Sequence, residues 1–210
     1  MAGSLIDYDR LRAAHLDAVG AALDDHVGRL DWSAEQIVSH RDRRLRSLLT
    51  YARERSPFYA DRLRDVDVSA ATVADLGSIP VLTKEEAQGR WDEIVTSPEL
   101  NRAEAERILD EQSWFSYTRH DEQVFSSGGS SGVRGVYVWD WQFFVSTACL
   151  AWRMQARDER CGTPVPDARL AVLSAAVPPH ASTPLFDVPT VPGMRTAVIE
   201  AGAPLSLIHI

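Results

Sequence analysis

The sequence predicts an α/β protein in which a mainly helical region, residues 1–113, precedes an α/β region, residues 114–210. Three observations support this division. Apolar residues before about residue 110 recur at helical spacing, and near Trp114 they give way to runs rich in β-branched and aromatic residues. Residues 170–177 then form a continuous apolar run, which is typical of a strand buried in a parallel sheet.

Composition narrows the class of protein. The 210 residues are 45% hydrophobic and 25% charged, which is ordinary for a globular chain with a sizeable core. The net charge of -8 argues against a nucleic-acid partner. The two cysteines, Cys149 and Cys161, do not have the spacing of metal ligands. No signal peptide is visible. The longest apolar run, residues 143–152, is too short to span a bilayer. We therefore expect a cytoplasmic protein that does not bind membranes.

The first sixty residues predict two helices. Residues 1–30 predict one weakly anchored helix, because small apolar residues occur there at loosely helical spacing. Residues 33–36 form a capping box that opens a second helix, and Pro57 ends it. Four arginines lie on the face opposite the apolar positions of this second helix. These arginines could form an anion site, but we favour a face exposed to water. They are Arg41, Arg43, Arg44 and Arg46.

The next stretch predicts short helices and a turn. Residues 72–75 begin a helix, and residues 83–86 form a capping box that places Lys84, the chain's one lysine, at the first helical position. We favour an exposed surface lysine over a functional one. Residues 97–113 predict a further helix, alone or with a loop. A strand over 114–117 and a turn over 119–123 follow, with His120 as a turn histidine and not half of a dyad with Asp121.

The segment 125–139 is the strongest functional signal in the chain. It holds four serines, four glycines and Arg134, between runs that read as strands. A strand–loop–strand of this composition turns backbone N–H groups and hydroxyls toward a bound anion, typically phosphate. The alternative is a flexible linker, which we disfavour because strand-like runs flank the loop directly. Asp140 then caps a helix that runs to about Arg157 and should be buried.

Two known kinds of phosphate loop do not fit this segment. A Walker A loop and a kinase glycine loop both need a lysine after the glycines, whereas Lys84 lies before them. The segment resembles the signature [ST]-S-G-[ST]-[ST]-G-x-P-x-G of the adenylate-forming (AMP-dependent) synthetase superfamily. Residues 127–132 match its first six positions, with Gly128 in place of the usual serine, whereas residues 133–135 are one residue short and lack the proline. Residues 55–63 and 76–86 look like the N-terminal hallmarks of the phenylacetate–CoA ligase-like branch. The resemblance spans residues 41–176.

This resemblance implies an activity and a site. It implies the N-terminal part of an ATP-dependent acid–CoA ligase, which activates a carboxylic acid as an acyl-adenylate and transfers it to the thiol of coenzyme A, with Mg²⁺ on the phosphates. It implies a pocket for the acid that includes His180. Catalytic residues and metal ligands are not assigned. The residues expected around the ATP phosphates are Ser126, Ser127, Gly128, Gly129, Ser130, Ser131, Gly132, Arg134 and Gly135.

The resemblance also implies an incomplete fold. Members of the family are about twice as long, so we expect the first part of the large adenylation domain, with mixed sheets and flanking helices. The smaller C-terminal domain and its catalytic lysine should be absent, and the chain alone should be inactive. The alternative is a truncated, catalytically inactive relative that acts only as a nucleotide- or phosphate-binding or interaction unit.

Overall fold

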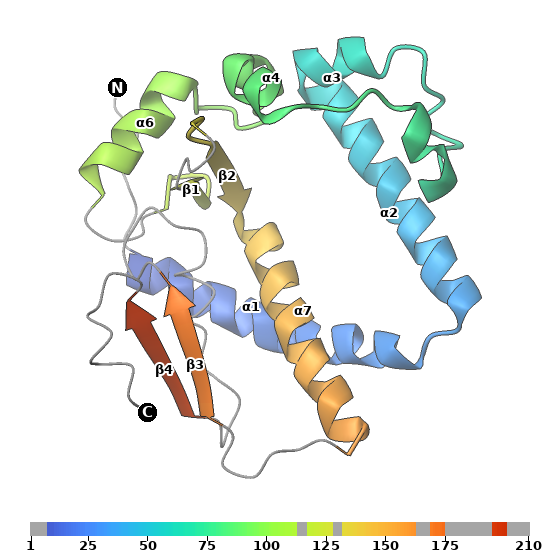
Figure 1. Cartoon of the computed structure of the whole chain (residues 1–210), viewed down its shortest axis with the longest axis vertical. Coiled ribbons are helices and arrows are strands. Elements are labelled where there is room, and N and C mark those ends of the chain that lie inside the picture. Colours follow the sequence, from blue (N-terminus) through green and yellow to red (C-terminus); the bar gives the residue numbers. More distant parts are fainter. Residues whose placement is uncertain (1–7, 113–116, 128–131, 163–168, 175–194, 201–210) are drawn as a thin grey trace.

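The computed structural model describes residues 8–112, 117–127, 132–162, 169–174 and 195–200. The expected mixture of helices and strands is confirmed, and each regular element described between residues 8 and 112 is helical (Figure 1). None of the helices in the described part of the chain combines the length and apolar character needed to cross a bilayer.

The helices gather in the first half of the chain and the strands in the second. The described helices are α1 (Tyr8–Gly28), the 3₁₀ helix η1 (Arg29–Asp31), α2 (Ala34–Arg55), α3 (Pro57–Arg62), the 3₁₀ helix η2 (Val73–Ser78), α4 (Lys84–Gly89), α5 (Trp91–Ile94), α6 (Arg102–Glu111) and α7 (Trp141–Arg160). The described strands are β1 (Glu122–Ser126), β2 (Val136–Asp140), β3 (Arg169–Ser174) and β4 (Arg195–Glu200).

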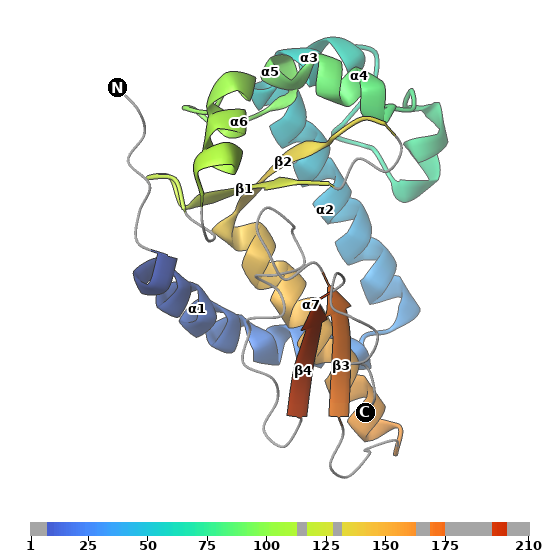
Figure 2. The same cartoon turned by 60° about the vertical axis from the view of Figure 1, so that its left-hand side comes forward.

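Helix α1 packs across α7, so the prediction of a weakly anchored N-terminal helix is wrong (Figure 2). Val19 of α1 is fully buried against Phe144 and Cys149 of α7. Few large apolar residues mark this face of α1, and two buried polar residues, Arg12 and His15, contribute to it. The spacing of hydrophobic residues alone therefore does not reveal how closely α1 packs on α7.

Helix α7 begins after its predicted cap, Asp140, whose carboxylate accepts from the N–H of Phe143 at 2.7 Å. The prediction that this helix is buried is wrong for one of its faces. Phe144 is 1% exposed, whereas Phe143 and Met154 are about half exposed. The buried positions recur at helical spacing along one face, which is the face that α1 covers.

Helix α2 ends before Pro57, as the sequence predicts, and the short helix α3, which was not predicted, begins there. The capping box at Ser33 forms, and Pro57 ends α2 while serving as the first residue of α3. The Ser56 hydroxyl accepts from the N–H of Tyr59 at 3.3 Å and donates to the carbonyl of Glu93 at 2.7 Å. This junction therefore fixes α3 to the end of α5.

The β1–β2 hairpin rests on α5 and α6. Val124 and Val136, one from each strand, join Trp91 and Ile108 in a single buried cluster. The two strands pair antiparallel, so the predicted hairpin is confirmed. The predicted turn before it is shorter than expected, because β1 already begins at Glu122.

The second sheet consists of β3 and β4, which pair in parallel with Arg169 opposite Arg195. The predicted strand at 170–177 is therefore confirmed as a strand over 169–174, while residues 175–177 and the burial of this strand lie outside the described part. Of the predicted strand 114–117, only Tyr117 is described, in an isolated bridge.

Candidate functional site

The β1–β2 hairpin holds the two ends of the Ser/Gly loop together. Its register runs to the pair Ser126 and Val136, and one further hydrogen bond joins the N–H of Ser127 to the carbonyl of Gly135 at 2.8 Å. The Ser127 hydroxyl in turn accepts from the N–H of Gly135 at 3.0 Å. A loop closed in this way behaves as a turn between paired strands and not as a linker between separate units.

Two described glycines of the loop occupy positions where a larger residue would be strained or would clash. Gly132 has φ +89°, a value that side-chain-bearing residues rarely adopt. Gly135 is close to the Tyr137 ring, since a Cβ there would lie 2.5 Å from the Tyr137 hydroxyl. Ser126 is buried and Ser127 half-buried. The other predicted site residues lie outside the described part of the chain: Gly128, Gly129, Ser130, Ser131 and His180.

Helix α4 is fixed to β2 beside the base of the loop. The Gln88 carbonyl oxygen accepts from the N–H of Val136 at 2.8 Å, and the Gln88 amide donates to the carbonyl of Val136 at 3.4 Å. The Trp91 indole donates to the same carbonyl at 3.0 Å. Together these bonds anchor α4 and α5 on the first residue of β2.

This anchoring brings Lys84 to the loop. Lys84 lies four residues before Gln88, so the two side chains share one face of α4. The Lys84 ammonium donates to the Ser127 hydroxyl at 3.2 Å, and its side chain is half-buried. The interpretation of Lys84 as an exposed surface lysine is therefore wrong. The spacing between Lys84 and Gln88 is a signal that could have placed it on the inner face.

The predicted capping box from Thr83 to Glu86 is half formed. The Thr83 hydroxyl accepts from the N–H of Glu86 at 3.1 Å, as predicted. The Glu86 carboxylate does not reach back to the cap, and instead pairs with the Arg62 guanidinium at 2.9 Å. Glu86 thereby joins α4 to α3 and lies on a different side of α4 from Lys84.

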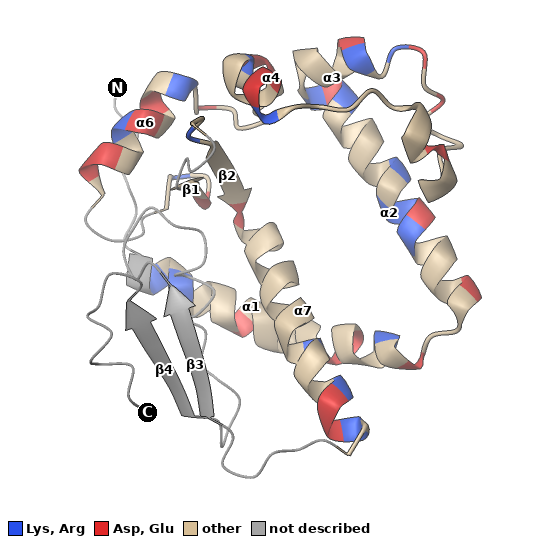
Figure 3. Cartoon of the chain, viewed as in Figure 1, with Lys and Arg blue, Asp and Glu red and all other residues tan. Residues whose placement is uncertain are grey.

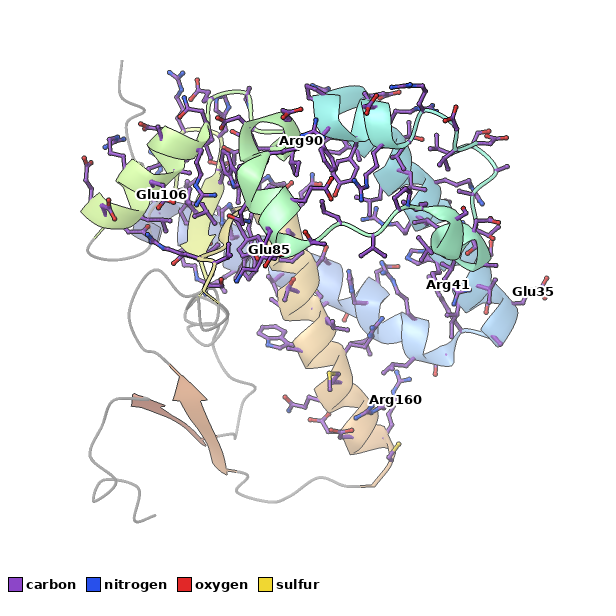
Figure 4. The ribbon with its side chains drawn as sticks, turned by 45° about the horizontal axis from the view of Figure 1, so that its top comes forward. Glu35, Arg41, Glu85, Arg90, Glu106 and Arg160 are labelled. Atoms are coloured by element: carbon purple, nitrogen blue, oxygen red, sulfur yellow. The ribbon has the colours of Figure 1, made fainter. Side chains whose placement is uncertain are left out.

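Arg134 points toward α6 in this structure. Its guanidinium pairs with the Glu106 carboxylate at 3.1 Å, and Glu106 also accepts from Arg102. Figure 4 labels Glu106 on α6, where basic and acidic residues alternate (Figure 3). An anion in the loop would compete with Glu106 for Arg134, because both are acceptors for the same guanidinium.

The described part of the site offers donors and positive charge. No described residue accepts the Ser127 hydroxyl proton, so this hydroxyl can donate to a ligand while it accepts from Lys84 and Gly135. Among the residues that the structure describes, no three His, Cys, Asp or Glu side chains are placed to hold a metal ion. His120 lies in a turn, as predicted, and its ring nitrogen is 3.1 Å from the Glu99 carboxylate, a contact that was not predicted. The arrangement therefore suits anion binding and assigns no general base.

Comparison with known proteins adds no relative, because no protein-family model, no curated protein and no solved structure matches this chain.

Proposed function

We propose that the β1–β2 loop binds the phosphate groups of ATP, within the N-terminal part of an acid–CoA ligase. The observation that carries this proposal is the ammonium of Lys84, 3.2 Å from the Ser127 hydroxyl. It adds the cation that phosphate binding favours to a closed loop of hydroxyls, backbone N–H groups and glycines. The order of the three sequence motifs supports the ligase part of the proposal.

The positive charge at the loop is local. The chain as a whole carries a net charge of -8, so its overall field does not attract an anion. Lys84 is partly removed from water, where its interaction with a phosphate is screened less than on an open surface. Attraction at this one place therefore has to come from Lys84, Arg134 and the loop N–H groups.

In the proposed reaction the carboxylate of the acid attacks the α-phosphate of ATP, and pyrophosphate leaves. Ser127, Lys84 and Arg134 would hold the β- and γ-phosphates, so the chain contributes positioning and electrostatic stabilisation. Mg²⁺ bound with ATP would neutralise phosphate charge, and no described residue is assigned to it. The role of His180 in the acid pocket, and coenzyme A as the acceptor, stay predictions from the resemblance.

Calorimetric titration with pyrophosphate and with ATP tests the loop directly. We expect Lys84→Met to lower the affinity for pyrophosphate and for ATP by about 10- to 100-fold, which is the range for losing one hydrogen bond to a charged group. Arg64→Met is the matched control, because it also removes one positive charge. Arg64 is exposed, follows α3 and pairs with Asp61. Equal affinities for Lys84→Met, the control and the unmodified chain would refute phosphate binding at this loop.

Acid-dependent ATP–pyrophosphate exchange tests the expectation that this chain alone is inactive. Because the resemblance places the catalytic lysine in the smaller C-terminal domain, we expect ATP to bind without exchange. Exchange that depends on a carboxylic acid and is lost in Lys84→Met would overturn that expectation and would mean that this chain activates the acid by itself.

A further inference from the structure

A second cationic site lies away from the β1–β2 loop, where η1 and the start of α2 meet the C-terminal half of α7. A cleft of about 640 Å³ opens there. Figure 4 labels Arg41 on α2, on the other side of the molecule from Glu106 on α6. Its arginines come from η1, α2 and α7: Arg29, Arg41, Arg44, Arg153 and Arg157.

The lining carries five arginines and no acidic residue. Three of the arginines pair with carboxylates outside the lining, as Arg29 does with Asp25. Within the described part of the chain, Arg44 and Arg153 have neither an ion pair nor a hydrogen bond. Two guanidinium groups from different helices thus line one cavity without an ion pair of their own among the described residues.

Arg41, Arg43 and Arg44 are exposed, as the interpretation of a solvated face predicts, and Arg41 and Arg44 also line one side of this cleft. Arg41 and Arg44 are met by Arg153 and Arg157 of α7, more than a hundred residues later. Like charges brought together from separate elements repel each other, and an arrangement that costs stability in this way is typical of a binding site. The pKa of His40 is lowered mainly by burial and further by the nearby Arg29, Arg43 and Arg44, while Asp25 opposes this shift.

An apolar wall lies beside the charges. The Trp32 ring has the guanidinium of Arg29 at 5.5 Å and the ring of His40 at 5.0 Å. Ile37 and Met154 complete this wall although each is about half exposed to water. A flat ring could lie against Trp32 while anionic groups reach the arginines.

We propose that this cleft binds a small phosphorylated ligand with two or more negative charges and a flat aromatic ring, such as a nucleotide or the nucleotide end of coenzyme A. Guanidinium groups match phosphate oxygens in charge and geometry, and the volume is of the size that small-ligand pockets have. The site depends on none of the residues proposed for the β1–β2 loop, so it stands or fails independently of the phosphate loop.

The indole N–H signal of Trp32 in a ¹⁵N–¹H spectrum reports on this cleft, and its disappearance in Trp32→Phe assigns it. The probes are tripolyphosphate for charge alone, adenosine for the ring alone, and ATP and coenzyme A for both. We expect ATP or coenzyme A to shift the signal at the lowest concentration, tripolyphosphate at a higher one, and adenosine least. Whichever of ATP and coenzyme A shifts the signal at the lower concentration identifies the ligand as a free nucleotide or as coenzyme A.

The double variant Arg44→Met with Arg153→Met should weaken this binding by at least about tenfold, since it removes two charged donors. Arg53→Met with Arg55→Met is the matched control, because it removes the same charge near the other end of α2. Neither Arg44 nor Arg153 has a described partner, so their removal should not lower the melting temperature. Lys84→Met should leave the Trp32 response unchanged, which separates this site from the loop.

Three results would overturn the proposal. The Trp32 signal could fail to respond to any of these ligands, the two double variants could lose affinity equally, or only an acidic polymer such as polyglutamate could shift the signal. The last result would assign the cleft to a macromolecular partner.

Discussion

At the scale of single residues, the local signals in the sequence were dependable where a short-range hydrogen bond decides the conformation. The caps at Ser33, Thr83 and Asp140 all form. Lys84 was misjudged because its position depends on Gln88 binding a strand nearly fifty residues later. The burial of His15 likewise depends on a residue far along the chain, since its partner Tyr117 lies 102 residues later.

The ion pair between Arg134 and Glu106 should restrain anion binding at the loop. Glu106→Gln removes the competing carboxylate, so we expect pyrophosphate to bind several-fold more tightly, measured by calorimetric titration. Glu104→Gln is the control, because it removes the same charge from α6 while its partner is Arg107. Unchanged affinity in Glu106→Gln would mean that Arg134 does not contact the anion.

His15 should make stability depend on pH. Its ring is buried, stacks on Trp141 and is 2.9 Å from the Tyr117 hydroxyl. Burial is the main cause that lowers the pKa of His15 below 6.5, with Asp121 opposing and Arg12 adding to the shift. The unfolded chain therefore binds more protons just below pH 6.5, and the free energy of unfolding should fall as the pH drops from 6.5 through the folded-state pKa.

Urea unfolding at about pH 5 and about pH 7.5 measures this effect. We expect His15→Phe to reduce the difference between the two free energies of unfolding. Some pH dependence should remain, because burial also lowers the pKa of His26 and His40. An unreduced difference in His15→Phe would contradict the assignment.

At the scale of elements, the sequence predicted the existence of most helices and of the hairpin, but not which faces are covered. Leu48 fits the apolar spacing of α2, yet it is 61% exposed, and the apolar residues Phe143 and Met154 of α7 are about half exposed. Periodicity reports which residues are apolar, and only the placement of other elements decides which of them are buried. The joints between elements depend instead on polar contacts such as that of Ser56.

Ser56→Ala should be costly because one hydroxyl serves two elements. It caps α3 and donates to the end of α5 while the residue is 1% exposed. We expect a loss of about 1–3 kcal/mol in the free energy of unfolding. Ser39→Ala, at an exposed position within α2, should change it by less than about 0.5 kcal/mol. Equal small losses in both variants would show that the junction does not depend on this hydroxyl.

At the scale of the whole molecule, the sequence predicted the order of helical and mixed regions but not the contact that joins them. Helix α1 from the start of the chain packs on α7, which follows the hairpin. The pairing of β3 with β4 is likewise a long-range contact, and the residues between them lie outside the described part. Such contacts are set by the global arrangement, which local sequence patterns do not specify.

The α1–α7 contact predicts very different roles for two adjacent phenylalanines. Phe144 is 1% exposed in this interface, and Phe143 is 48% exposed. Phe144→Ala should lower the free energy of unfolding by about 3–5 kcal/mol, whereas Phe143→Ala should lower it by less than about 1 kcal/mol. Urea denaturation checks both. Similar losses in the two variants would contradict the packing of α1 on α7.

Lys84 allows the most direct measurement of the central claim, that the β1–β2 loop binds phosphate with the help of this lysine. Because the chain has one lysine, reductive dimethylation with ¹³C-formaldehyde labels only Lys84 and the terminal amine, and keeps both positively charged. Titration with pyrophosphate, in the Arg44→Met and Arg153→Met background, should shift the ¹³C signal of Lys84 saturably and leave that of the terminal amine in place. A Lys84 signal that does not move while pyrophosphate binds elsewhere, or that moves no more than the terminal amine, would contradict the account.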